Sequence, residues 1–203
     1  MKLIIQIPCL NEEQTLPETL KDLPKSLNGI DDIEILIIDD GSTDRTVQFA
    51  KEHGAHHVLK LTNNKGLAKA FIFGISHSLK LGADIVVNTD ADNQYVGHDI
   101  AKLVQPILQN EADIVIGDRR VEPIRHFSPI KIFLQKVGSW VVRQLSKTQI
   151  PDATSGFRAY SRSAAMQVNV VSDFTYTLET IISAGNKNLA IAHTPVRTNR
   201  KVR

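Results

Sequence analysis

An Asp-x-Asp pair is the feature of this sequence best suited to chemistry. Asp90 and Asp92 directly follow the apolar stretch 85–87. Side chains at positions i and i+2 of extended backbone project to the same side, so the two carboxylates can converge on one ligand. Carboxylate and amide oxygens suit hard cations such as Mg²⁺ and Mn²⁺, and Gln94 lies two positions further on. The spacing predicts a metal site made of Asp90, Asp92 and Gln94.

The segments around these acids alternate between two patterns. Short apolar, β-branched stretches predict strands, and apolar residues at helical spacing predict helices. The predicted strands are 2–7, 34–38, 57–61, 85–87, 113–116 and 189–193. The predicted helices are 11–23, 42–53, 67–81, 99–110, 132–146 and 173–185. This alternation predicts an α/β fold with an open, mostly parallel sheet that has helices on both faces and binds ligands at the carboxyl ends of its strands.

A second acidic pair, Asp39 and Asp40, follows the strand predicted at 34–38, so both pairs should meet at the same edge of the sheet. Asn11 is expected to cap the helix at 11–23, and Ser42 or Thr43 to begin the next helix. On the residues alone, a phosphatase-type or response-regulator-type acidic pocket stays open.

Composition excludes several classes of protein. The chain has 203 residues, of which 42% are hydrophobic and 23% charged, as in an ordinary soluble domain. The single cysteine, Cys9, excludes an internal disulfide, and no glycine-rich phosphate loop is present. Aromatic residues make up only 5%, which argues against a nucleic-acid partner. Pro8 ends the opening strand and no apolar run approaches a membrane span, so a cytoplasmic chain is expected.

Charge is distributed unevenly along the chain. Residues 1–118 hold 10 Lys and Arg against 18 Asp and Glu, whereas 119–147 hold seven bases and one acid. Residues 187–203 add five bases and no acid. One interpretation is a polar or metal site in the first part and an anionic partner for the second. The other is that the basic residues only solvate helix faces.

Four motifs occur together in order, and two more follow them. The four are Ile7-Pro8-Cys9-Leu10-Asn11-Glu12-Glu13, Ile38-Asp39-Asp40-Gly41-Ser42-Thr43-Asp44-Arg45-Thr46, Asn64-Lys65-Gly66 and Asp90-Ala91-Asp92-Asn93-Gln94, and the two later ones are Gly117-Asp118-Arg119 and Ser155-Gly156-Phe157-Arg158. The four resemble those of family 2 glycosyltransferases, which have the nucleotide-sugar-binding GT-A fold. The two later ones resemble the dolichol- or polyprenyl-phosphate mannosyltransferase branch.

The resemblance covers essentially the whole chain and implies one three-layer α/β/α domain. Residues 1–118 would form the nucleotide-sugar-binding half and 119–203 the acceptor half. By resemblance, Asp40 contacts the nucleotide base, and the metal and donor diphosphate lie at the predicted metal site. The other implied nucleotide-binding residues are Pro8, Asn11, Glu12, Gly66 and Asp90.

The same resemblance gives the basic residues a role. Arg119 would act in catalysis beside Asp90 and Asp92. The residues implied to face the acceptor or donor phosphates are Arg119, Lys131, Arg158 and Arg203. A phosphate acceptor is already ionised at neutral pH and needs positioning more than a base. A sugar hydroxyl would need a base, for which Asp152 and Glu179 are the candidates.

The implied activity is metal-dependent, inverting transfer from GDP-mannose or UDP-glucose to a polyprenyl or dolichyl phosphate, with Mg²⁺ or Mn²⁺ as cofactor. The enzyme would act peripherally at the cytoplasmic face of a membrane. Alternatives are transfer to a sugar hydroxyl of a glycan or glycolipid, nucleotide-sugar binding without transfer, and a basic membrane-surface adaptor. Relatives usually continue beyond the position of Arg203, so a C-terminal membrane-associating segment is expected to be absent from this chain.

Overall fold

The computed structural model describes residues 1–119, 151–170 and 176–199. Its strands are β1 (Lys2–Cys9), β2 (Asp32–Asp39), β3 (His57–Lys60), β4 (Ile85–Asn88), β5 (Ile114–Asp118), β6 (Arg158–Ser161) and β7 (Ile191–Pro195). Its α-helices are α1 (Leu16–Asp22), α2 (Thr46–Glu52), α3 (Leu67–Lys80), α4 (Ile100–Leu108), α6 (Arg162–Gln167) and α7 (Tyr176–Asn186), and a short 3₁₀ helix, η1 (Gly97–Asp99), precedes α4.

The strands form one seven-stranded sheet in the order β3-β2-β1-β4-β6-β5-β7. All neighbouring pairs are parallel except those of β6, which is antiparallel to both β4 and β5. The chain progresses outward from β1 to β2 and β3, and then crosses back to place β4 on the other side of β1. The gap between the carboxyl ends of β1 and β4 is therefore a topological switch point, where open α/β sheets bind ligands.

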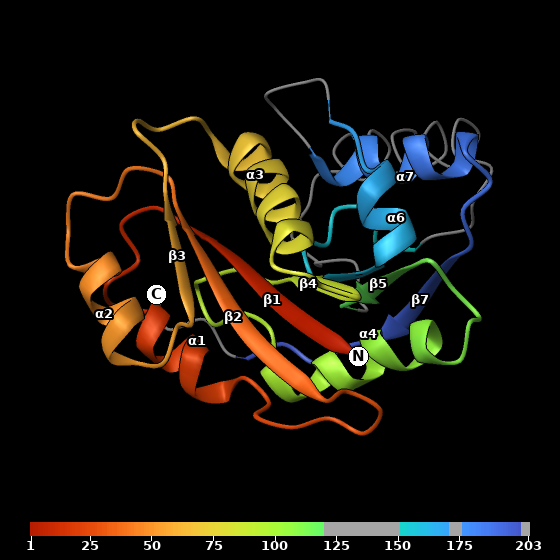
Figure 1. The fold of residues 1–203 in the computed structure, drawn as a ribbon, viewed down its shortest axis with the longest axis horizontal. Helices are drawn as coiled ribbons and strands as arrows, with labels where there is room; N and C mark the ends of the chain where they lie inside the picture. The colour runs from red at the N-terminus through yellow and green to blue at the C-terminus, as the bar shows by residue number, and fades with distance from the viewer. Residues whose placement is uncertain (120–150, 171–175, 200–203) are drawn as a thin grey trace, which may run out of the picture.

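Helices cover both faces of the sheet (Figure 1). Strand β1 shows why, because its side chains alternate between two apolar clusters. Leu3 and Ile5 pack with α1 and α4, whereas Ile4 packs with α3, α6 and α7, and all three side chains are fully buried. A strand that is apolar on both faces needs a helical layer on each side. The predicted three-layer α/β/α fold with a mostly parallel sheet is confirmed.

Helix α3 packs closely on the sheet at one glycine. A Cβ atom at Gly74 would lie 2.6 Å from Gln6 Oε1 and 2.8 Å from Ile38 Cδ1. The absence of a side chain therefore lets α3 approach β1 and β2, and this fixes the helix whose first residues border the site described below.

The first two helices begin later than predicted. Helix α1 begins at Leu16, with Pro17 in its first turn, and α2 begins at Thr46. Asn11 does not cap α1, because it lies five residues before the helix in the left-handed region, with a φ of 55°. Ser42 and Thr43 likewise precede α2 in a loop. The residues predicted as helix starts instead build the loops after β1 and β2.

Strand β6 and helix α6 were not predicted. β6 is only four residues long and begins with the charged Arg158, which is fully buried. Its neighbour Tyr160 is also fully buried, so burial and pairing with β4 and β5 outweigh the weak strand pattern. The helix predicted at 132–146 lies outside the described residues.

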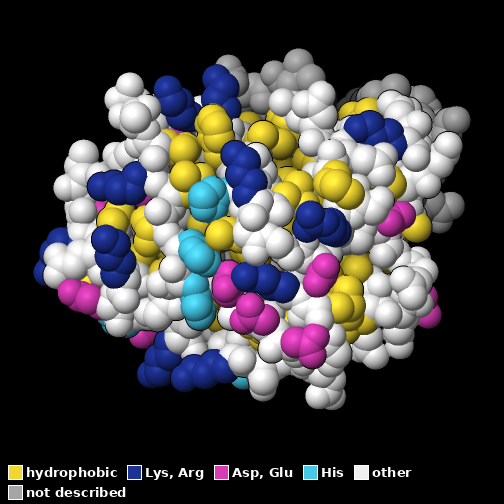
Figure 2. Space-filling view, in the orientation of Figure 1, with side chains coloured by type: hydrophobic (Ala, Val, Ile, Leu, Met, Phe, Trp, Pro, Cys, Tyr) yellow, Lys and Arg dark blue, Asp and Glu magenta, His cyan; other side chains and the backbone are white. Residues whose placement is uncertain are grey.

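Acidic and basic side chains are intermingled on the face of the molecule that Figure 2 shows. Figure 2 shows basic and acidic side chains among apolar ones, and neither sign covers this face. In the described ranges, none of the helices combines the length and apolarity needed to cross a bilayer.

Candidate functional site

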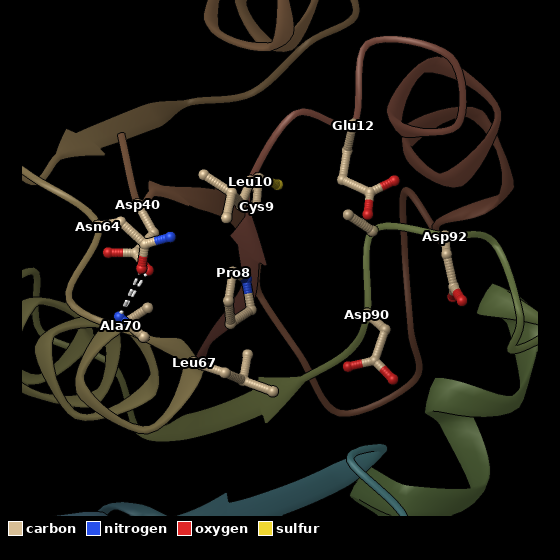
Figure 3. A pocket seen from close by; sticks show the side chains of 12 residues that line it. Pro8, Cys9, Leu10, Glu12, Asp40, Asn64, Leu67, Ala70, Asp90 and Asp92 are labelled. Atoms are coloured by element: carbon tan, nitrogen blue, oxygen red, sulfur yellow. Dashed lines mark hydrogen bonds between the residues drawn. The ribbon is translucent and has the colours of Figure 1, made fainter. Parts of the chain in front are cut away.

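A cavity of about 400 Å³ opens at the switch point between β1 and β4. The loops after β1, β2 and β4 and the first turns of α3 supply its walls. Figure 3 shows Asp40 and Asn64 at one end, three carboxylates at the other, and Pro8 and Leu67 between them. The lining residues are Pro8, Cys9, Leu10, Glu12, Asp40, Asn64, Gly66, Leu67, Ala70, Asp90, Ala91 and Asp92.

The loops after β1 and β2 are joined by reciprocal hydrogen bonds. Asn11 N donates to Ser42 Oγ at 2.9 Å, and Thr43 N donates back to Asn11 Oδ1 at 2.8 Å. Glu12 N donates to Thr46 Oγ1 at 2.8 Å. Asn11, an expected nucleotide-pocket residue, is therefore a link between two loops and does not itself line the cavity.

Asp40 is positioned by a turn that precedes α3. Its Oδ1 accepts from Lys65 N at 2.7 Å and its Oδ2 from Gly66 N at 2.9 Å. Gly66 has a φ of 86°, a backbone conformation that favours glycine. Each carboxylate oxygen keeps a further lone pair, so Asp40 can also accept from a ligand N–H in the cavity. Asp40 and Gly66, both expected nucleotide-binding residues, are brought together here.

The other end of the cavity is acidic. The carboxylates of Glu12, Asp90 and Asp92 gather there (Figure 3). Burial, and then the negative charge of Asp92, raise the pKa of Asp90 to about 6, although Arg119 acts in the opposite direction. Gln94 N donates to Asp92 Oδ1 at 3.1 Å, but the Gln94 side chain does not line the cavity.

This acidic end fits a hard cation that shares its ligands with a substrate. The carboxylate charge of the partly buried Asp90 and Asp92 is what a divalent cation would compensate. Within the described ranges, no cluster of three or more candidate ligands is arranged to hold a metal by protein atoms alone. Mg²⁺ and Mn²⁺ commonly take one or two carboxylates together with substrate phosphates, which agrees with such a donor set.

A second cavity, of about 220 Å³, adjoins the first across Asp90. Asp90 and Leu67 line both cavities, and Arg119 lines the second. The remaining lining residues of the second cavity are Tyr95, Thr154, Gly156, Tyr176 and Thr177. Acidic side chains therefore gather at one end of the first cavity, the Arg119 guanidinium lines the second, and Asp90 lies at the boundary between them.

Arg119 is held in place by Asp152. The guanidinium donates from Nε to Asp152 Oδ2 at 2.7 Å and from Nη2 to Oδ1 at 3.0 Å, a two-point contact, and also to Thr154 Oγ1 at 3.0 Å. Hydrogen bonding to Asp152 raises the pKa of Arg119. Burial acts to raise the pKa of Asp152, but the hydrogen bonds and positive charge of Arg119, together with the hydrogen bond from Thr154, outweigh burial and keep that pKa below the ordinary value. A carboxylate so paired is a poor proton acceptor, so Asp152 is better suited to position Arg119 than to act as a base.

Arg158 lies away from both cavities. It is fully buried and donates to Ser155 O, Thr177 O and Ala153 O at 2.7–2.8 Å. These bonds tie β6 to the segment before it and to α7, so we leave Arg158 out of the proposed phosphate site. Glu179 lies on α7 and lines neither cavity. Lys131 and Arg203 lie outside the described residues.

A buried polar network beneath Asp90 was not predicted. Asn88 Nδ2 donates to Gly156 O at 2.9 Å and to Tyr176 Oη at 3.2 Å, and Asn88 Oδ1 accepts from Gln6 Nε2 at 2.9 Å. Gln6 and Asn88 are fully buried. Polar residues inside two otherwise apolar strands were the sequence pattern that could have indicated this network. It connects β1 and β4 to the floor of the second cavity.

Solved structures of known proteins share this fold. Glucosyl-3-phosphoglycerate synthase from Mycobacterium tuberculosis, solved with Mn²⁺, uridine diphosphate and phosphoglyceric acid, superposes with a TM-score of 0.78 at 20% identity. The similarity covers 100% of this chain and 71% of that structure. The same protein in complex with Mn²⁺ and UDP-glucose gives a TM-score of 0.77.

Sequence comparison identifies the family. A dolichyl-phosphate N-acetylglucosaminyltransferase of Methanococcus voltae, whose donor is named as UDP-N-acetylglucosamine, is 31% identical over 95% of this chain and 83% of its own length. The polyprenol monophosphomannose synthase of Mycolicibacterium smegmatis is 26% identical over 95% of this chain and 76% of its own length. The glycosyl transferase family 2 domain matches residues 4–168. This match and the similarity to these relatives show that the chain is a glycosyltransferase and belongs to family 2.

Proposed function

We propose that this enzyme transfers a sugar from a nucleoside-diphosphate sugar to a polyprenyl phosphate, with inversion at the anomeric carbon and with a divalent cation. The observation that carries the proposal is the pair of adjoining cavities that meet at Asp90, one lined by acids and the other by Arg119. Relatives named for dolichyl, undecaprenyl and polyprenol phosphates support the acceptor class.

The first cavity would take the donor. At one end Asp40 offers lone pairs to an N–H of the base, while Pro8 and Leu67 supply apolar walls beside it. The diphosphate would then lie at the acidic end, beside Asp90 and Asp92. A cation bound between these carboxylates and the diphosphate would neutralise the charge that develops on the leaving group.

The second cavity would take the acceptor phosphate. Arg119 presents a guanidinium that Asp152 holds in a fixed orientation, and a planar guanidinium suits a phosphate group. The acceptor phosphate oxygen would then attack the anomeric carbon of the donor from the face opposite the departing nucleoside diphosphate, as an inverting displacement requires. A phosphate oxygen that is already ionised needs no base, and this agrees with Asp152 being engaged as an ion-pair partner.

Donor binding is tested by thermal-shift titration. GDP-mannose, UDP-glucose and UDP-N-acetylglucosamine are each added with and without Mn²⁺, since a ligand that binds the folded state raises the melting temperature. We expect one donor to give a shift that depends on Mn²⁺ and that is lost in Asp92→Asn. The control is Asp32→Asn at the start of β2, at the opposite end of the strands, which should behave as wild type. An Asp92→Asn protein with an unchanged Mn²⁺-dependent shift would refute the metal site.

Acceptor choice is tested by transfer assays with a polyprenyl phosphate and with an uncharged glycolipid. Removing one electrostatic contact to a transition state typically costs about 10²-fold or more, so Arg119→Ala should lower transfer to the phosphate by about that factor. Arg119→Lys keeps the charge but loses the two-point geometry, so its rate of transfer to the phosphate should lie between those of the wild type and Arg119→Ala. Arg162→Ala, whose side chain contacts Ala83 O at the far end of β4, is the matched control. Transfer to the glycolipid alone would refute the phosphate acceptor.

A further inference from the structure

We propose that Asn199 is a positioning residue for the loop that carries Asp92 and Gln94. The loop, residues 89–96, joins β4 to η1. The proposal rests on the proposed function, because it concerns how this loop presents its carboxylate to the cation and diphosphate.

Ala91 and Tyr95 anchor the 89–96 loop in the core, whereas Asp92, Asn93 and Gln94 between them are only partly buried. Asn93 adopts a left-handed conformation with a φ of 52°, and Gln94 N bonds to the side chain of Asp92 within the loop. Thr19 Oγ1 donates to Ala91 O at 2.9 Å, which holds the loop from the side of α1. The outer side of the loop, around Asn93 and Gln94, needs support from elsewhere in the chain.

Asn199 supplies that support. Its Nδ2 donates to Asn93 O at 3.1 Å and to Tyr95 O at 3.3 Å, so one carboxamide holds the carbonyls on both sides of Gln94. Its backbone N donates to Gln94 O at 2.8 Å. Three consecutive loop residues are therefore bonded to Asn199. These bonds to the carbonyl groups of Asn93, Gln94 and Tyr95 hold the backbone that directly follows Asp92.

The segment that contains Asn199 is itself anchored at two places. Arg197 donates from its backbone N to Asp99 Oδ2 at 2.7 Å and from Nη2 to Asp99 Oδ1 at 2.8 Å. Val196 N donates to Asp118 O at 2.9 Å, and the Val196 side chain is buried in the core. Asp118 is the residue before Arg119. One short segment thus connects the loop of the donor cavity to the end of the strand that leads to the acceptor cavity.

The variant Asn199→Asp tests this role because it keeps the shape of the side chain and removes its donors. A carboxylate would then face the carbonyls of Asn93 and Tyr95, and the loop would lose its outer support. We expect the Mn²⁺ concentration for half-maximal binding of GDP or UDP, whichever the wild type binds, to rise about 10-fold or more. Asn199→Ala should show a smaller rise in the same direction, and it replaces Asn199→Asp if that variant fails to fold.

The readouts separate positioning from general stability. The melting temperature without ligand and the KM for the acceptor should stay close to wild type, and Asn28→Asp, in an exposed turn after α1, should change nothing. Unchanged Mn²⁺ dependence in both Asn199 variants, with loss of binding in Asp92→Asn, would overturn the positioning role and leave the proposed function standing. Unchanged Mn²⁺ dependence in Asp92→Asn as well would overturn both.

Discussion

Asp40 provides the sharpest test of the donor cavity, because one carboxylate both holds a turn and faces the ligand. In Asp40→Asn, one oxygen becomes an NH₂ group that must face a backbone N–H, either Lys65 N or Gly66 N. One hydrogen bond to a charged acceptor is lost; if it is the bond from Gly66 N, that N–H keeps a second acceptor, Asn64 Oδ1 at 3.0 Å. The side chain of Asp40 sits where only 4% of the residue is exposed, so water cannot replace the bond easily.

The magnitude follows from these contacts. Loss of a hydrogen bond to a charged group costs about 2–3 kcal/mol in the free energy of unfolding. For a domain of this size that corresponds to a fall in melting temperature of about 5–10 °C. Binding of the nucleoside diphosphate should weaken by about 10-fold or more, because the ligand N–H loses its carboxylate acceptor.

The assay compares Asp40→Asn with Asp113→Asn by thermal unfolding and by nucleotide titration. Asp113 precedes β5 at the other end of the sheet and accepts from Ala190 N at 3.0 Å and Ser161 Oγ at 3.3 Å. Asp113→Asn should therefore lose stability and keep nucleotide affinity, whereas Asp40→Asn should lose both. Wild-type melting together with wild-type affinity in Asp40→Asn would refute the role given to this carboxylate.

Three further predictions concern packing and charge. Gly74→Ala should destabilise the protein by about 1–2 kcal/mol in urea unfolding, because the new methyl group meets the buried Gln6 at 2.6 Å; an unchanged midpoint would contradict this packing. Gly156→Ala would place a methyl group at the boundary of the two cavities and should lower kcat while nucleotide affinity is kept; equal kcat would show that the boundary tolerates it. Burial acts to raise the pKa of Asp99, but hydrogen bonds from Arg197 and Lys102 and the charge of Lys102 together outweigh it and lower the pKa to about 2. This folded-state pKa lies below the unfolded value, so the pair stabilises the fold above about pH 4 and loses about 2 kcal/mol as pH falls toward 2; urea unfolding at pH 6 and pH 3 should show a smaller acid loss in Asp99→Asn.

The parts of the fold that were predictable depend on local pattern. The strand 85–87 is apolar throughout and 2–7 is apolar apart from Lys2 and Gln6, so both were predicted as buried strands of a covered sheet. Gly54 and Gly82 lie just beyond the ends of α2 and α3 with φ values of 94° and 87°, a backbone conformation that favours glycine, so these helix ends agree with the predicted ranges 42–53 and 67–81. β6 was missed because a buried arginine at the start of a strand can be recognised only when its carbonyl partners are known.

The site was predictable where a carboxylate follows a strand. Asp40, Asp90 and Asp92 line one cavity because the ends of parallel strands converge, and this convergence follows from the βα order alone. The role of Asn11 was wrong as a helix cap, because the sequence does not show that its partners are Ser42 and Thr43, about 30 positions away. The pairing of Arg119 with Asp152 was likewise invisible, since 33 positions separate them.

That ion pair has a consequence for chain length. Arg119 and Asp152 bring together the two ends of the segment 120–151. Their ion pair therefore offsets part of the entropy lost when this segment is closed, whatever the sequence of the segment. The entropic cost of closing a chain segment rises slowly with its length, by only about 0.6 kcal/mol for each doubling. Segments of other lengths should therefore be exchangeable between Arg119 and Asp152 without unfolding the sheet. This makes the position a natural place to graft the corresponding segment of a relative and ask whether acceptor preference moves with it.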